Sequence, residues 1–151
     1  MRLAKLGQLF RDRDGRLPID HLDEETTLMR SSFRKFAQEQ VVPLAEQIHR
    51  DDLLVPDSII DGVRELGCFG LSVPEKYGGL KPDGEENSLG MVVVTEELSR
   101  ASLGAAGSLI TRPEIMARAI LEGGTDEQTH RWLPGIARGD TLVAISVTEP
   151  G

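Results

Sequence analysis

Two residues in this sequence have the type and position needed for chemistry. Arg112 follows a run of small residues, and a planar guanidinium can pair with a carboxylate through two parallel hydrogen bonds. Thr148 follows the run 141–147, and a hydroxyl with backbone N–H groups at the end of a strand can donate hydrogen bonds from fixed positions. Simpler interpretations remain open: Arg112 is solvated or tied to Glu114 or Glu122, and Thr148 belongs to an ordinary strand end.

The other reactive residue types favour structural roles. The histidines are far apart in the sequence and lack the spacing of metal ligands: His21, His49 and His130. Cys68 is expected to be a small core residue. The pair Gly78-Gly79 does not follow a strand and open a helix, so it is no nucleotide-binding fingerprint. The sequence therefore predicts no metal site.

The composition excludes several classes of partner. The chain has 151 residues and a net charge of −8, which argues against nucleic acid and against an anionic membrane surface. No run of residues is apolar for long enough to span a bilayer. A single cysteine rules out an intrachain disulfide, so we expect a reducing, cytoplasmic location.

Helical periodicity predicts the elements that position these residues. Apolar residues recur every three or four positions in five stretches, which we interpret as amphipathic helices. The stretches run from about 23 to 50, from 56 to 67, from 88 to 101, around 115–120 up to Gly123-Gly124, and from 125 to 139. The first twenty residues carry five basic side chains with little periodicity and read as a flexible arm, residues 1–20.

Individual residues within these helices carry sharper expectations. Pro43 should bend the first helix because it removes a backbone hydrogen bond. Leu66 belongs to the expected buried face of the second helix, and Ser88 is placed to cap the third. In the third helix Glu97 is expected to face solvent or a partner. Trp132 lies on the expected apolar side of the fifth helix.

The end of the sequence changes period. Residues 141–147 are rich in β-branched side chains and predict a strand, the only clear one in the chain. A single strand cannot satisfy its own backbone groups, so its partner is expected in a missing domain or another chain. The final Pro-Gly favours the centre of a turn that the sequence does not complete. We therefore divide the chain into an arm (1–20), a helical domain (21–140) and the first strand of a truncated domain (141–151).

Four motifs, in order, resemble those of acyl-CoA dehydrogenases. The loop V-P-E-K-Y-G-G is followed by the helical E-E-L-S-R, then by G-G-T-D-E-Q with W-L-P, and finally by V-T-E-P-G. The resemblance runs from about His21 to Gly151. It implies a mainly α fold, namely the orthogonal helical bundle of the family's N-terminal domain, with one C-terminal β-strand that belongs to a middle β domain.

The family resemblance also implies an activity. These enzymes use FAD to remove hydrogens from the α and β carbons of an acyl-CoA thioester and pass the electrons to an electron-transfer flavoprotein. They work as homodimers or homotetramers. The expected acyl group is short-chain, branched or dicarboxylic. No catalytic residue is assigned here, because the glutamate base of most members lies in the C-terminal domain.

Site residues follow from matching positions. Ile145, Val147 and Thr148 match positions that lie along the flavin. Thr111 and Arg112 lie in a stretch similar to the pocket helix of the (2S)-methylsuccinyl-CoA dehydrogenases, where an arginine could bind a distal carboxylate. Two departures stand beside this likeness: the long N-terminal extension of that subfamily is absent, and the polar insert at 81–87 is longer than expected.

Two other functions remain open at this stage. A non-enzymatic helical module could bind a partner through its lone strand or an exposed helix face. A flavin monooxygenase or a nitroalkane oxidase could be built on the same fold, since the deciding residues lie beyond Gly151. As a fragment of an acyl-CoA dehydrogenase, the 151 residues alone are expected to be inactive.

Overall fold

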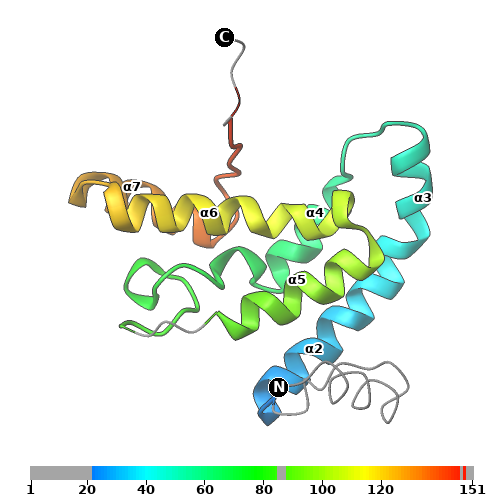
Figure 1. The fold of residues 1–151 in the computed structure, drawn as a ribbon, viewed down its shortest axis with the longest axis horizontal. Coiled ribbons are helices and arrows are strands. Elements are labelled where there is room, and N and C mark those ends of the chain that lie inside the picture. Colours follow the sequence, from blue (N-terminus) through cyan, green and yellow to red (C-terminus); the bar gives the residue numbers. More distant parts are fainter. Residues whose placement is uncertain (1–21, 85–87, 147, 149–151) are drawn as a thin grey trace, which may run out of the picture.

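The computed structural model describes residues 22–84, 88–146 and 148, and these form a helical domain (Figure 1). The predicted arm lies outside the described residues. The elements in chain order are α2 (Glu24–Phe36), η1 (Ala37–Val41), α3 (Val42–Arg50), α4 (Asp57–Glu65), η2 (Cys68–Gly70), η3 (Glu75–Tyr77), α5 (Leu89–Ala101), η4 (Leu103–Gly107), α6 (Ser108–Gly123) and α7 (Asp126–Ala137). The predicted mainly α fold is confirmed. None of the described helices is long and apolar enough to cross a membrane.

The first helical stretch is one long helix with a change of winding in the middle. Between α2 and α3 the segment η1 is a turn of π-helix, and the N–H of Val42 bonds the carbonyl of Ala37, five residues back. Pro43 follows at the start of α3 and has no N–H to offer. The wider turn before the proline accommodates the missing bond, and the helix bends there, as predicted (Figure 1).

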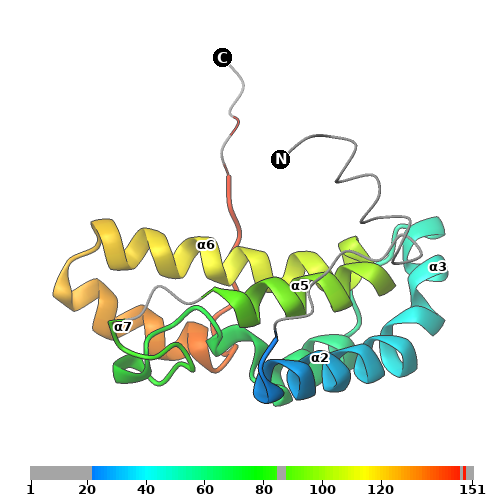
Figure 2. The ribbon, with the colours of Figure 1, turned by 60° about the horizontal axis from the view of Figure 1, so that its bottom comes forward.

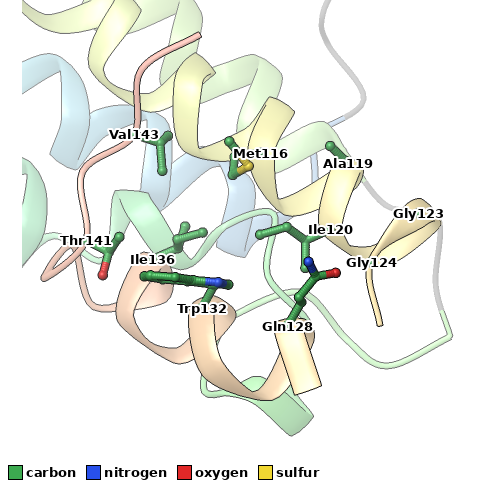
Figure 3. A pocket seen from close by; sticks show the side chains of 10 residues that line it. All are labelled: Met116, Ala119, Ile120, Gly123, Gly124, Gln128, Trp132, Ile136, Thr141 and Val143. Atoms are coloured by element: carbon green, nitrogen blue, oxygen red, sulfur yellow. The ribbon is translucent and has the colours of Figure 1, made fainter. Parts of the chain in front are cut away.

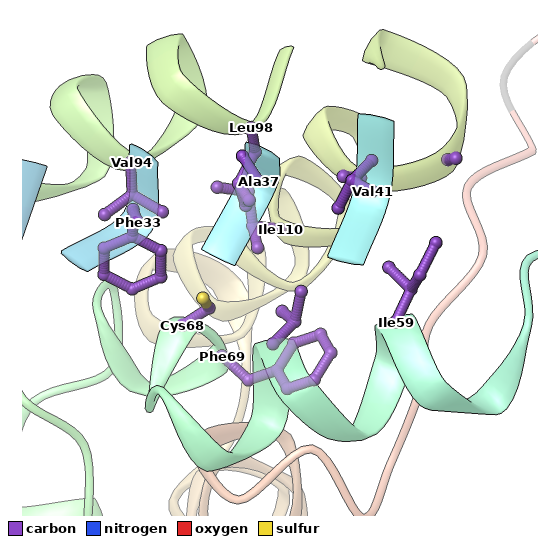
Figure 4. Close-up of a cluster of buried hydrophobic side chains, with 12 residues drawn as sticks. Phe33, Ala37, Val41, Ile59, Cys68, Phe69, Val94, Leu98 and Ile110 are labelled. Carbon is purple, nitrogen blue, oxygen red and sulfur yellow. The ribbon is translucent and has the colours of Figure 1, made fainter. Parts of the chain in front are cut away.

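The main core forms where α5 lies between α2 and α6 (Figure 2). Its buried side chains are almost all aliphatic or small, as the scarcity of aromatic residues required. Figure 4 shows them meeting from α2, η1, α4, η2, α5, η4 and α6: Phe33, Ala37, Val41, Ile59, Val63, Cys68, Phe69, Val94, Leu98, Ala105, Ala106 and Ile110. Cys68 is buried in this core, as predicted, and burial raises the pKa of its thiol well above its usual range.

A second, smaller core lies under α7. It joins Val73 to Ala117 of α6 and to residues of α7, and Val143 packs against it from outside. Helix α7 begins as predicted, because the Thr125 hydroxyl accepts from the Gln128 N–H and the Gln128 side chain accepts from the Thr125 N–H. This core therefore ties the last helix, and the chain that leaves it, to the rest of the domain.

Four expectations about single residues were wrong. Leu66 is 36% exposed. It lies just after the end of α4, and the left-handed conformation of Gly67 changes the direction of the chain there. The side chain of Ser88 makes no capping bond, and its hydroxyl accepts from Arg118 instead. Trp132 is 40% exposed. Glu97, expected to face solvent or a partner, is buried inside the domain.

Glu97 is buried because it has a partner on a helix far away in the sequence. It is 1% exposed and accepts two hydrogen bonds from Arg34 of α2, at 2.9 Å from Nε and 2.7 Å from Nη2. These bonds hold the pKa of the Glu97 carboxyl below its usual range, and they raise the pKa of Arg34. The pair fixes α5 against α2 at the surface of the main core.

Candidate functional site

The chain leaves α7 through a turn in which successive N–H groups are paired. Gly139 has a φ of 72°, a left-handed conformation that favours glycine, and its N–H bonds the carbonyl of Ile136 at 2.9 Å. The N–H groups of Asp140 and Thr141 both donate to the carbonyl of Gly135, at 2.9 and 3.1 Å. The direction in which residues 141–148 depart is therefore set by α7.

Residues 141–148, the exit segment, carry the predicted flavin contacts. In Figure 1 this segment leaves the helices and extends away from them. Among its described residues from Leu142 onward, no backbone group has a hydrogen bond, so no strand ladder forms and the predicted strand stays a prediction. Ile145 is 40% exposed and Thr148 is exposed, whereas Val147 lies outside the described residues. The described residues of the segment thus carry backbone donors without hydrogen bonds and partly exposed apolar side chains.

A cavity of about 510 Å³ opens between α6, α7 and the start of the exit segment (Figure 3). The Trp132 ring forms one wall, with the Arg131 guanidinium 4.7 Å from the ring centroid. The Gln128 amide and the Thr141 hydroxyl supply polar groups in a mostly apolar lining: Met116, Ala119, Ile120, Gly123, Gly124, Trp132, Ile136 and Val143. The sequence placed Trp132 on the apolar side of the fifth helix. Trp132 directly precedes the buried Leu133, and adjacent residues of a helix point in different directions, so its place at the edge of the buried face could have been inferred.

Thr111 and Arg112 are neighbours on α6 with different surroundings. Thr111 is half-buried, donates to the carbonyl of Ser108 at 3.2 Å, and lines a groove of about 450 Å³ between α5 and α6. Arg112 is exposed and makes no hydrogen bond or ion pair with any residue in the described part of the chain. Glu114, one of the two glutamates considered as a partner of Arg112, instead binds Arg118 at 2.5 Å. The guanidinium of Arg112 is therefore available to a ligand, although it does not line the groove that holds Thr111.

The structure thus places the predicted site residues in two groups. Thr111 and Arg112 lie on α6, and Ile145 and Thr148 lie on the exit segment. No hydrogen bond joins the two groups within the described ranges. Val143 packs on the smaller core beside Met116 of α6, so the exit segment starts from the flank of the helix that carries the first group (Figure 3).

The comparisons with known proteins agree on one family. The family described as "Acyl-CoA dehydrogenase, N-terminal domain" matches residues 23–140. The (2S)-methylsuccinyl-CoA dehydrogenase of Cereibacter sphaeroides is 46% identical over 149 residues, which cover 97% of this chain and 26% of that protein. The chain therefore spans about a quarter of the length of this relative.

Two solved structures show the same arrangement of helices. A glutaryl-coenzyme A dehydrogenase in complex with glutaryl-CoA superposes with a TM-score of 0.77 at 27% identity, covering 86% of this chain and 32% of that one. An acyl-CoA dehydrogenase from Bacillus anthracis in complex with FAD gives a TM-score of 0.72 at 27% identity, covering 89% of this chain and 23% of that one.

Proposed function

Because the chain belongs to the acyl-CoA dehydrogenase family, we propose that it is the N-terminal part of an enzyme that uses FAD to introduce a double bond between the α and β carbons of an acyl-CoA thioester. The observation that supports this most strongly is the order of parts: a helical domain matching the family over residues 23–140, followed by residues 142–146, which have no hydrogen-bonded partner in the described part of the chain, and then by the sequence motif V-T-E-P-G. On this proposal the 151 residues supply one wall of a site and lack its catalytic base.

The exit segment fits a flavin by the chemistry of its groups. FAD, when bound, accepts the hydride that leaves the β carbon, and negative charge then collects on its pyrimidine edge. The described groups of the segment are backbone N–H donors, the free Thr148 hydroxyl and the apolar side chain of Ile145. They carry no negative charge that would oppose a reduced flavin. Ile145, Val147 and Thr148 would therefore lie along the cofactor, with Thr148 donating.

We further propose a dicarboxylic acyl-CoA as the substrate. The similar proteins include one named for methylsuccinyl-CoA and one bound to glutaryl-CoA, both with a second carboxylate on the acyl group. Arg112, exposed and without a protein partner among the described residues, offers the matching fork of donors. Thr111 supports the same role by lining the neighbouring groove.

Replacing Arg112 with alanine in the full-length enzyme tests this substrate class. We expect kcat/KM on methylsuccinyl-CoA to fall roughly thirtyfold, because the distal carboxylate loses its partner. This corresponds to a loss of about 2 kcal/mol of transition-state stabilisation. Butyryl-CoA, which lacks that carboxylate, is the control substrate and should lose little. Equal values for the variant and the parent on methylsuccinyl-CoA would exclude Arg112 from substrate binding.

The proposed enzyme class is tested by the protein made from the complete gene. It should purify yellow, with one FAD per subunit, and reduce an electron acceptor on addition of acyl-CoA. We place the enzyme in the cytoplasm, as a homodimer or homotetramer that passes electrons to an electron-transfer flavoprotein. A colourless full-length protein that captures a partner chain through residues 142–148 would favour the interaction-module alternative.

A further inference from the structure

One peptide group in the turn after α7 is held from both sides. The peptide between Gly139 and Asp140 donates its N–H to the carbonyl of Gly135 at 2.9 Å. Its own carbonyl accepts from Nη2 of Arg64, a residue of α4, at 3.2 Å. The plane of this peptide is therefore held by α7 on one side and by α4 on the other. Arg64 of α4 lies 75 residues before Gly139 in the sequence.

Arg64 is itself held in place. Its other terminal nitrogen pairs with Asp61, one turn earlier in α4, so the guanidinium spans from its own helix to the turn. The fit around Gly139 is close, because a Cβ there would lie 2.4 Å from the Phe69 ring and 3.3 Å from Nε of Arg64. The glycine is buried, and Phe69 belongs to the main core. The contact thus connects the turn to the rigid part of the domain.

We propose that Arg64 is a positioning residue that sets the direction of the exit segment, and through it the place of Thr148 beside the flavin. This inference rests on the proposed function. Residues 142–146 have no backbone hydrogen bond in the described part of the chain, so the turn held by Arg64 is the last bonded point before them and sets where they begin.

The control for this contact is present in the same chain. Arg50 lies in the last turn of α3 and pairs with Glu46 one turn earlier, as Arg64 pairs with Asp61, but among the described residues it makes no bond to the exit turn. Arg64→Gln removes the contact to Gly139 together with the local ion pair. Arg50→Gln removes a local ion pair alone. Arg64→Lys keeps the charge and one donor, and it should retain part of the function.

The experiment uses the full-length protein with FAD bound and has two readouts. Hydrogen exchange of a peptide covering residues 136–142 reports on the turn, and the visible absorption and dissociation constant of FAD report on the cofactor. In Arg64→Gln we expect exchange at Asp140 about tenfold faster and FAD binding about tenfold weaker, with a shifted flavin band. Arg50→Gln should match the parent protein, and Arg64→Lys should lie between the two.

The possible results test the role of Arg64 separately from the proposed function. Equal exchange and equal FAD binding in the two glutamine variants would overturn the role of Arg64, as would faster exchange with an unchanged flavin. If Arg64→Gln fails to fold, Arg64→Lys decides by the same two readouts. If the parent protein binds no flavin, yet hydrogen exchange in the turn is faster in Arg64→Gln, the placement of Thr148 beside a flavin is overturned, and with it the proposed function.

Discussion

Replacing Gly79 with alanine is expected to cost about 4 kcal/mol of folding free energy, at the extreme of what single substitutions do. A Cβ at this position would lie 1.8 Å from the carbonyl oxygen of Val73 and 2.4 Å from its carbonyl carbon. The backbone cannot yield cheaply, because Lys81 N–H bonds that same oxygen at 3.0 Å and Gly79 N–H bonds Pro74 at 3.2 Å. The methyl group would therefore open the loop that closes over the second core.

Gly78, the preceding residue, provides the matched control. It has a φ of 82°, and nothing lies within 4 Å of where its Cβ would be. Alanine there should cost about 1 kcal/mol, the strain of a left-handed conformation alone. Urea unfolding of the two variants and the parent gives both values. Equal losses for Gly78→Ala and Gly79→Ala would show that backbone conformation, and not the close approach to Val73, explains the glycine pair.

Local signals in the sequence predicted the helices well. The helix start expected at Thr125, the helix ends expected at Gly67 and Gly139 and the bend at Pro43 all depend on groups within a few residues of chain, so they do not depend on the rest of the fold. The glycine pair 78–79 was recognised as part of a family motif. The close approach of Gly79 to Val73 became visible only in three dimensions.

Contacts between distant helices were not predictable in the same way. Glu97 was expected to face solvent or a partner. Its burial was missed because Arg34, which binds it, lies 63 residues away and no spacing rule connects the two. A signal did exist: Glu97 follows the buried Val93 by four residues, so it shares the inward face of α5. Likewise, the link between Arg64 and Gly139 joins α4 to the end of α7 across 75 residues.

The residues of the candidate site were predicted from motifs alone, and they stay predictions. The helical domain that carries Thr111 and Arg112 matches the family over residues 23–140. The availability of Arg112 could not be derived, since two nearby glutamates were equally plausible partners until Glu114 was found on Arg118. A strand needs hydrogen bonds from a neighbour, so the structure of residues 142–146 cannot follow from their own sequence.

The buried ion pair between α2 and α5 makes a strong, pH-dependent prediction. Arg34→Met should lower the free energy of unfolding at pH 7 by about 3 kcal/mol, because the Glu97 carboxylate would stay 1% exposed without its partner. We place the loss at the lower end of the range for buried pairs, since the Arg34 side chain is 43% exposed. Arg50→Met, which removes an exposed partner of Glu46, should cost no more than about 0.5 kcal/mol.

The sign of the pH dependence separates this explanation from a loss of packing. In the parent protein the pKa of Glu97 is lowered by Arg34, so the stabilisation is complete above the ordinary pKa of a glutamate and is lost as the pH falls through the lowered value. In Arg34→Met the largest cause that lowers this pKa is lost, and burial raises it against the weaker attraction of Arg100 and Arg30, so the variant gains stability when Glu97 takes up a proton. The difference between the two proteins should therefore shrink between pH 7 and pH 4. Urea unfolding across this range measures it, and a constant difference would mean that Arg34 acts through its hydrocarbon chain and not through its charge.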